Sequence, residues 1–326
     1  MSPVLVTGAT GFMGRHLVAS LLEDGRAVRV LERRPGDAFD GLPVERVTGD
    51  VTQPGTLEAA CAGAESVFNL AGVLSYDAKD EARLQAVNVD GLQNLLTAAR
   101  QAGCGRVVQV SSVAAVGYTD DAARPQHEDS PFPAGAWRNR YSRSKRLGEE
   151  VVMRAVAEGQ DVVMACPGFL LGPGDVNRIN TFVVEEYLRG VLRTTVAGGI
   201  SSVDVRDVAR GLVAAERLGV SGRRYILTSE DGNLSHRAFF ALAGEVDGKR
   251  RRTFELPPAL LVAGARLGRT LRLPVPLSPE EIEAACHWWY FTPARAMDEL
   301  GFRPRPVREA MEATVKYLRD RGLRRR

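Results

Sequence analysis

Residues Thr7-Gly8-Ala9-Thr10-Gly11-Phe12-Met13-Gly14 follow the short apolar run Val4-Leu5-Val6 and decide the fold of this chain. Glycines at three-residue spacing directly after an apolar strand predict a tight turn into a helix. We expect Gly8 to allow the turn, Gly11 to let the backbone approach a pyrophosphate, and Gly14 to let the helix pack closely on the sheet. The N-terminus of such a helix offers free N–H groups to an anion, so the stretch predicts a dinucleotide-binding site.

Short apolar runs alternate with helical patterns through most of the chain. Several runs lack polar alternation, which is typical of parallel strands buried on both faces. Strands joined by helical crossovers form a doubly wound sheet, so we predict an α/β fold with a parallel Rossmann sheet. The predicted strands are Val4–Thr7, Ala27–Glu32, Val44–Thr48, Ser66–Leu70, Arg106–Ser111, Asp161–Ala165 and Tyr225–Thr228. The predicted helices are Gly11–Asp24, Thr56–Cys61, Ala82–Ala102, Tyr141–Glu158 and Val205–Leu218.

A second, smaller lobe is predicted from the change of pattern after Pro167, where Gly172-Pro173-Gly174 precedes a helical stretch, Thr181–Arg189. From Ser235 onward helical patterns dominate. We therefore expect an NAD(P)-binding Rossmann domain in 1–167 and 203–230, and a discontinuous C-terminal substrate-binding lobe in 168–202 and 231–326. The substrate is expected in the cleft between them.

The composition excludes several classes of protein. Of 326 residues, 44% are apolar and 25% charged, and the formal net charge of +3 is too small to indicate a nucleic-acid partner. No apolar run reaches the roughly 18 residues of a membrane span, and no secretion signal follows Met1. The cysteines Cys61, Cys104, Cys166 and Cys286 are far apart in sequence, so neither a disulfide framework nor a metal site is indicated. A reducing cytoplasm fits this usage best.

Tyr141 and Lys145 stand four residues apart, which places them on one face of a predicted helix. A phenol has an ordinary pKa of about 10, and a neighbouring ammonium favours its ionised form. We therefore expect Lys145 to lower the pKa of Tyr141 and to make it a general acid and base. Only four of the 43 basic residues are lysines, and one of them occupies this position.

The choice between NAD and NADP depends on the end of the second predicted strand. Glu32 stands where an acidic side chain hydrogen-bonds the adenosine ribose, and Asp50 and Val51 follow the third strand, where a carboxylate would lie near the adenine. Arg33 is the competing feature, because a guanidinium can bind a 2′-phosphate. We expect NAD(P), with a preference for NAD, because Glu32 has a fixed reach and Arg33 begins a proline-containing loop.

With these residues together, the chain resembles the extended short-chain dehydrogenase/reductases, also called the NAD-dependent epimerase/dehydratase family. The likeness covers essentially the full length and is greatest to the dihydroflavonol-reductase-like branch, which includes proteins labelled hopanoid-associated sugar epimerases. It rests on the glycine motif and on Gly49-Asp50, Asn69-Leu70-Ala71-Gly72, Asn88-Val89-x-Gly91, Val110-Ser111-Ser112, Tyr141-x-x-x-Lys145, Pro167, Gly172-Pro173-Gly174-Asp175, Val203–Ala209 and Ala296–Pro304.

The resemblance implies a catalytic set of Ser112, Tyr141 and Lys145. Ser112 would hydrogen-bond the substrate oxygen and is preferred over Ser111 because the family's serine lies five residues before a glycine, here Gly117. Tyr141 would exchange a proton with that oxygen, and Lys145 would hold the nicotinamide ribose. The full set of expected cofactor-binding residues is Gly8, Gly11, Phe12, Met13, Gly14, Glu32, Arg33, Asp50, Val51, Leu70, Ala71, Gly72, Tyr141, Lys145, Pro167 and Gly168.

The chain departs from the family pattern at two places. Cys166 precedes Pro167 where many relatives have arginine, and we interpret it as a small core side chain rather than a reactive thiol. The segment 197–202 lacks the basic residue that clamps a substrate diphosphate in sugar-nucleotide enzymes, although Arg178, Arg189 or Arg193 would be substitutes. Candidate substrate residues are Ser75, Tyr76, Trp137, Arg138, Phe169, Asn177 and Arg178.

The leading hypothesis is an NAD(P)-dependent oxidoreductase that interconverts a secondary alcohol and a ketone on a small organic molecule. A sugar or sugar-nucleotide epimerase or dehydratase, which returns the hydride, is the enzymatic alternative. A regulator that only binds NAD(P) is a third hypothesis, and the intact set of Ser112, Tyr141 and Lys145 argues against it. The family also implies a homodimer through the helices predicted at 82–102 and 141–158. The candidates for both the internal face and part of the interface are Leu84, Val87, Leu92, Leu95 and Leu96.

Overall fold

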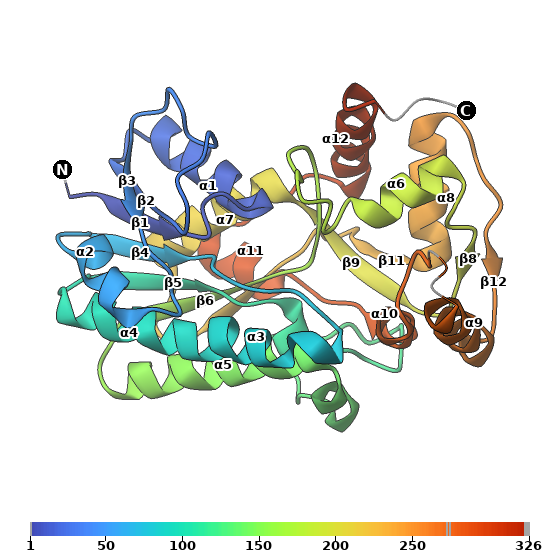
Figure 1. The fold of residues 1–326 in the computed structure, drawn as a ribbon, viewed down its shortest axis with the longest axis horizontal. Helices are drawn as coiled ribbons and strands as arrows, with labels where there is room; N and C mark the ends of the chain where they lie inside the picture. The colour runs from blue at the N-terminus through green and yellow to red at the C-terminus, as the bar shows by residue number, and fades with distance from the viewer. Residues whose placement is uncertain (1, 272, 274, 323–326) are drawn as a thin grey trace.

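A parallel sheet of seven strands occupies one half of the molecule in the computed structural model, which describes residues 2–271, 273 and 275–322 (Figure 1). The strand order is β3-β2-β1-β4-β5-β6-β10, and every neighbouring pair is parallel. This order confirms the predicted doubly wound Rossmann sheet. The strands are β1 (Val4–Thr7), β2 (Val28–Glu32), β3 (Val44–Thr48), β4 (Ser66–Asn69), β5 (Arg106–Val110), β6 (Val162–Pro167) and β10 (Arg224–Leu227).

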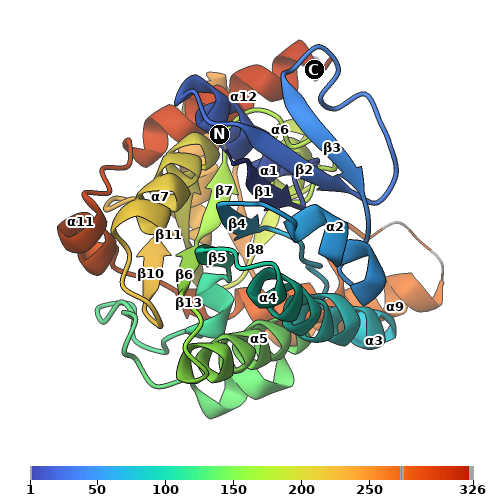
Figure 2. The ribbon, with the colours of Figure 1, turned by 90° about the vertical axis from the view of Figure 1, so that its left-hand side faces the viewer.

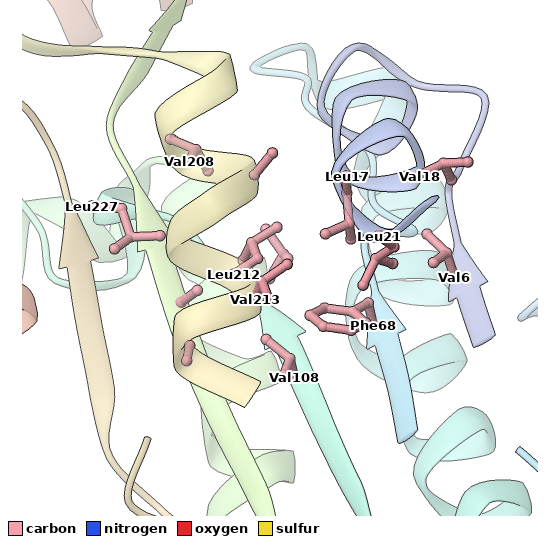
Figure 3. Packing of buried hydrophobic residues seen from close by; sticks show 14 of the residues in the cluster. Val6, Leu17, Val18, Leu21, Phe68, Val108, Val208, Leu212, Val213 and Leu227 are labelled. Carbon is pink, nitrogen blue, oxygen red and sulfur yellow. The ribbon is translucent and has the colours of Figure 1, made fainter. Parts of the chain in front are cut away.

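Helices cover both faces of the sheet (Figure 2). One face carries α1 (Phe12–Glu23), α7 (Val205–Leu218) and α11 (Ala294–Leu300), and the other carries α2 (Leu57–Cys61), α4 (Gly91–Gln101) and α5 (Arg140–Ala157). Apolar side chains of α1 and α7 meet over Phe68 and Val108 of the sheet (Figure 3). Coverage of both faces explains why the strands read as apolar runs without alternation.

The helix predicted at 82–102 is divided into three parts. A helical turn, α3 (Glu81–Gln85), leads into a π-helical turn at Ala86–Asp90, and α4 follows. The wider π turn carries Asn88, whose amide bonds both backbone groups of Val73 and the Ser144 hydroxyl. π-turns inside helices are frequent at functional sites, and this one joins three segments that border the site described below.

The second lobe is built around a small sheet with β9 (Gly199–Asp204) at its centre. This strand pairs with β7 (Phe169–Leu171), β11 (Asn233–Ser235) and β13 (Trp288–Trp289), while β8 (Thr194–Thr195) pairs with β12 (Phe254–Glu255). Around these strands pack α6 (Phe182–Arg189), α8 (His236–Asp247), α9 (Pro258–Thr270), α10 (Pro279–Ala285) and α12 (Val307–Asp320), which form the right-hand half of Figure 1.

The chain crosses between the two halves more often than the expected ranges suggest. The segment with α11, which we assigned to the substrate lobe as part of 231–326, places Ala296, Leu300 and Phe302 in the core cluster of α1 and α7. The last residues of that expected segment, 323–326, lie outside the described residues. The two-part division remains a prediction.

Within the described ranges, no helix is both long enough and apolar enough to cross a membrane. The same residues contain no group of three or more metal-ligating side chains that could hold an ion.

Candidate active site

The glycine turn between β1 and α1 has the geometry of a dinucleotide cradle. Gly8 has a φ of +63°, and a Cβ there would lie 2.6 Å from the carbonyl carbon and oxygen of Leu70. At Gly11 an added Cβ would meet only the Gly8 oxygen, at 3.1 Å, so this side of the turn is open to a ligand. At Gly14 a Cβ would lie 2.4 Å from the Gly8 oxygen, which shows how closely α1 packs on the turn. Each glycine thus meets the physical requirement that its position predicted.

Glu32, at the end of β2, is buried and paired with Arg46 of β3. Arg46 Nε donates to Glu32 Oε2 at 2.8 Å, and the same guanidinium bonds Asp40 and the Gly36 carbonyl. The other carboxylate oxygen, Oε1, is buried without a hydrogen-bond partner among the described residues. An orphaned carboxylate oxygen fits a ribose hydroxyl donor, whereas the ion pair with Arg46 was not foreseen from the sequence.

The other expected adenosine-side residues lie where the strands β2 and β3 end. Arg33 is exposed. Asp50 accepts hydrogen bonds from the backbone N–H and the hydroxyl of Thr52, at 2.9 and 2.8 Å. Val51 is buried under α4, where a Cβ on Gly91 would lie 2.8 Å from it. Asp50 therefore has free acceptor capacity, while the Val51 side chain serves the core.

Ser112, Tyr141 and Lys145 line one cavity of about 630 Å³ between the sheet and the second lobe. Ser112 follows β5, and the other two project from the first turns of α5, which Asn139 caps by accepting from Ser142 N at 3.0 Å. The Lys145 ammonium is buried and donates to the Val110 carbonyl at 3.2 Å. Ser112 lies 29 positions before Tyr141, yet both line one cavity because the strand end and the helix start meet at the same edge of the sheet.

The expected lowering of the Tyr141 pKa is wrong for this geometry. Loss of hydration raises the pKa of the phenol, and a hydrogen bond with Ser112 only partly offsets the rise. The same loss of hydration lowers the pKa of Lys145 to about 8. The ammonium contacts the Val110 carbonyl, so desolvation outweighs any attraction between the cation and an ionised phenol.

The lowered pKa of Lys145 predicts a pH dependence of stability. The lysine has a pKa of about 10.4 in the unfolded chain, so between about pH 8 and pH 10 the unfolded state binds more protons than the folded state. The free energy of unfolding contributed by this group therefore rises with pH in that window, by about 2 kcal/mol between about pH 7.5 and pH 9.5. Urea unfolding of the wild type and of Lys145→Met at both pH values measures it. Identical pH dependence in the two proteins would contradict the assignment.

Behind Lys145, one helical turn further along α5, Glu149 is the centre of a buried polar cluster. It accepts from Ser111 Oγ at 2.7 Å, from Arg224 Nη1 at 2.9 Å and from Cys166 Sγ at 3.4 Å. Burial and the neighbouring carboxylate hold the pKa of the Cys166 thiol well above its usual range. Cys166 is thus a buried thiol in a structural cluster, as its interpretation as a core side chain predicted.

Asn88 connects the loop after β4 to α5. Its Oδ1 accepts from Val73 N at 2.8 Å, and its Nδ2 donates to the Val73 carbonyl and to Ser144 Oγ, each at 2.9 Å. A Cβ on Gly72 would lie 3.3 Å from Lys145 Nζ and 3.5 Å from Asn88 Oδ1. The loop after β4 is therefore fixed against α5 close to Lys145.

The cavity contains part of each expected residue set. Of the expected cofactor residues, Met13, Leu70, Gly72, Tyr141, Lys145, Pro167 and Gly168 line it, and the others lie at or after the ends of β1, β2, β3 and β4. Of the expected substrate residues, Tyr76 and Phe169 line it. The ring centroids of Tyr76 and Tyr141 are 6.1 Å apart.

The remaining expected substrate residues have other contacts. Ser75 donates to Asp80 at 2.7 Å, Trp137 packs edge-on against Phe132, and Arg138 and Asn177 are exposed. Arg178 pairs with Glu185 and Glu186 and lies over the Phe182 ring. None of these five is among the lining residues in the described part of the chain.

Apart from Gly168 and Phe169, the lining from the second lobe was not predicted from the sequence. Apolar side chains of α6, α8, α9 and α10 supply a large part of it, among them Val183, Phe239, Leu261 and Ile282. Their helical patterns were recognised, but a pattern shows only that a face is apolar, not which cavity it encloses.

A model of the NAD dependent epimerase/dehydratase family matches residues 4–227. The chain belongs to this family. It is 32% identical, over 97% of its length and 94% of the relative's, to a protein of Synechocystis sp. provisionally named dihydroflavonol 4-reductase. It is also 32% identical to sterol demethylase protein B of Methylococcus capsulatus, with 98% and 99% of the two chains covered. The crystal structure of gox2253 has the same fold, with a TM-score of 0.86, 28% identity and 99% coverage of both chains.

Membership confirms the resemblance that the motifs indicated and makes the protein an enzyme of an NAD-dependent oxidoreductase and epimerase family. The residues present fit the cofactor. The open side of the turn at Gly11 and the uncapped start of α1 suit its pyrophosphate, and the unpartnered Oε1 of Glu32 suits a ribose hydroxyl.

Proposed function

We propose that the protein is an NAD(P)-dependent oxidoreductase that interconverts a secondary alcohol and a ketone, with Ser112, Tyr141 and Lys145 as its catalytic residues. The observation that carries the proposal is their convergence in one cavity with Gly72, Pro167 and other expected cofactor residues. One relative is named as a reductase, which supports net redox chemistry.

The nicotinamide, when bound, supplies the hydride acceptor or donor. Ser112 hydrogen-bonds the substrate oxygen and holds it within reach of Tyr141, which donates a proton to the forming alcohol or accepts one from it. A raised pKa keeps the Tyr141 proton in place at neutral pH, which suits reduction of a ketone. The Lys145 ammonium would hold the ribose hydroxyls of the cofactor and supplies a buried positive charge to the same cavity as oxyanion character develops.

Stoichiometric change in the near-ultraviolet absorbance of the reduced nicotinamide, with a ketone or a secondary alcohol as substrate, tests this proposal. The alternative, an epimerase or dehydratase, returns the hydride, so product would form without net consumption of cofactor. Binding of cofactor with no turnover of any substrate class would favour the regulator instead.

The cofactor preference that we propose is NAD(H), supported by the orphaned Oε1 of Glu32. Glu32→Gln is expected to weaken NAD(H) binding about tenfold and to improve the relative use of NADP(H), since a charged hydrogen bond contributes roughly 1.5–3 kcal/mol. Arg33→Ala should change NAD(H) binding little. Titration of each variant with both cofactors measures the effect.

A control separates recognition of ribose from tethering by Arg46. Asp40→Asn removes another carboxylate that Arg46 contacts, at 3.0 Å, and leaves Glu32 intact. It should therefore bind NAD(H) as the wild type does. Tighter NADP(H) than NAD(H) binding by the wild type, lost on Arg33→Ala, would reverse the preference.

We propose a homodimer on the family's pattern, with a revised contact surface. Leu84, Leu92, Leu95 and Leu96 are buried in the protomer's own core and only Val87 is partly exposed, so these side chains are not free for an interface. An interface there would use the polar outer faces of α4 and α5. Light scattering at micromolar concentration with cofactor present is expected to give twice the protomer mass, and a monomer would contradict it.

A reducing compartment such as the cytoplasm is proposed from the cysteines, all four of which are free thiols.

A further inference from the structure

We infer that the substrate is an elongated, apolar alcohol or ketone, whose reacting oxygen lies at Ser112 and Tyr141 and whose apolar body extends into the second lobe. This inference rests on the proposed function and adds the chemical class of the substrate. It excludes a nucleotide diphosphate sugar as the molecule that the cavity accepts.

The lining of the cavity changes along its length. At the sheet edge it includes the proposed catalytic residues and the loop after β4. In the second lobe aliphatic and aromatic side chains predominate, including Val183, Ile200, Phe239, Leu261 and Ile282. The polar lining residues there are Asn180, Thr194, Thr195, Ser201, His236 and Glu281. A volume of about 630 Å³, shared with the nicotinamide end, lies within the roughly 300–1,000 Å³ of cavities that hold medium-sized organic ligands.

The charged side chains that line the cavity are not complementary to a diphosphate. Among the described lining residues only Lys145 and Glu281 are charged, although 43 lysines and arginines occur in the chain. Lys145 lies at the catalytic end, and Glu281 caps α10 by accepting from Ser278 N at 2.7 Å. A diphosphate would meet this carboxylate and, among the described lining residues, no guanidinium. Burial of its charges without partners is strongly unfavourable.

The lining histidine does not replace the missing cation. His236 forms a 2.8 Å hydrogen bond through Nε2 with the Ala285 carbonyl, and burial lowers its pKa, which keeps the ring neutral at pH 7. The Nε2 atom of His236 therefore already has a hydrogen-bond partner in the backbone of α10.

The arginines that were candidates for a diphosphate clamp have other partners. Arg178 and Arg189 pair with Glu185 and Glu186, and Arg193 donates to the Arg252 carbonyl at 2.9 Å. None of the three lines the described part of the cavity.

Apolar residues also line the mouth of the cavity. Ile179 and Leu260 both line it and are 55% and 59% exposed, so they lie at its mouth. An entering molecule therefore meets apolar surface before it reaches the catalytic end, which favours a substrate with a long apolar body.

A series of unbranched secondary alkanols of four, six, eight and ten carbons, oxidised with NAD, measures the preference. Each buried methylene contributes a free energy equivalent to about a fourfold gain, so kcat/KM is expected to rise roughly two- to fourfold per methylene. UDP-glucose should neither compete with the longest alkanol nor be turned over. A flat series, or competition by UDP-glucose at micromolar concentration, would overturn the inference.

Two variants on α9 form a matched pair. Leu260 and Leu267 are 59% and 60% exposed, but only Leu260 is among the described residues that line the cavity. Leu260→Asp is expected to reduce kcat/KM for the ten-carbon alkanol at least tenfold and for the four-carbon alkanol little. Leu267→Asp should leave both values unchanged, and equal losses in the two variants would contradict the assignment of the cavity mouth.

Failure of the inference and failure of the proposed function give different results. If short alkanols are oxidised but chain length brings no gain, the redox function stands and the substrate class is wrong. If no alkanol is oxidised, binding of the fluorescent apolar dye Nile red, and its displacement by the ten-carbon but not the four-carbon alkanol, still tests the substrate class. Absence of both oxidation and dye displacement overturns both statements.

Discussion

Replacement of Tyr141 by phenylalanine is expected to lower kcat about 10²–10⁴-fold while cofactor binding survives. The phenyl ring keeps its packing beside Tyr76, but the proton that is exchanged with the substrate oxygen is lost. Steady-state kinetics with a turned-over alkanol, combined with cofactor titration by fluorescence, separates the two effects. Near-normal turnover by this variant would show that the Ser-Tyr-Lys assignment is wrong.

Tyr76→Phe is the matched comparison, because it removes a hydroxyl from the same cavity. Loss of hydration raises the pKa of Tyr76 well above that of an ordinary phenol, so it keeps its proton. Its removal is expected to reduce turnover at most about tenfold, the effect of one neutral hydrogen bond. An equal loss in Tyr76→Phe and Tyr141→Phe would leave no special role for Tyr141.

Lys145→Arg is expected to lose activity despite its retained charge, because the larger planar guanidinium does not fit beside Gly72 and the Val110 carbonyl.

Gly14→Ala is expected to have the second largest effect, a loss of about 3 kcal/mol in the free energy of unfolding together with loss of cofactor binding. The new Cβ would lie 2.4 Å from the Gly8 oxygen and 2.6 Å from Ala9 Cα, so backbone must move. The movement would displace α1 from β1 at the pyrophosphate turn. Alanine normally stabilises a helix by about 1 kcal/mol relative to glycine, so a net loss would show that close packing dominates.

Gly36→Ala is the control, because a Cβ there meets nothing within 4 Å. Its free energy of unfolding should stay within about 0.5 kcal/mol of the wild type. Urea unfolding and NAD(H) titration of both variants measure the difference. A Gly14→Ala protein as stable as the wild type would mean that the turn relaxes without cost.

Much of the proposed catalytic end was predictable because its determinants are local. The glycine spacing requires a particular backbone turn, and the four-residue spacing of Tyr141 and Lys145 puts them on one helix face in any fold that contains that helix. Parallel strands then place all their carboxyl ends at one edge, so residues after β1, β4, β5 and β6 meet there whatever their distance in sequence. The positions of Ser112 and Gly72 in the cavity follow from this rule.

Electrostatic expectations were less reliable, since they depend on burial and on partners from other elements. Proximity in sequence suggested that Lys145 would lower the pKa of Tyr141, whereas loss of hydration raises it. Arg46 forms an ion pair with Glu32 because β2 and β3 are neighbours in the sheet, which the local sequence does not reveal. Arg178 has an acidic side chain, Glu185, one turn into α6 as its partner, so it supports the loop rather than the substrate site.

The sequence by itself determined the alternation of strands and helices, the glycine turn after β1 and the placement of Tyr141 and Lys145 on one helix face, because each depends on local residue spacing. Only the tertiary structure decided the character of the substrate cavity, since α6, α8, α9 and α10 come from separate parts of the chain and enclose it together. An amphipathic pattern indicates that one face of a helix is buried away from water. Which faces meet, and whether they leave a cavity between them, is set by the packing of the whole lobe.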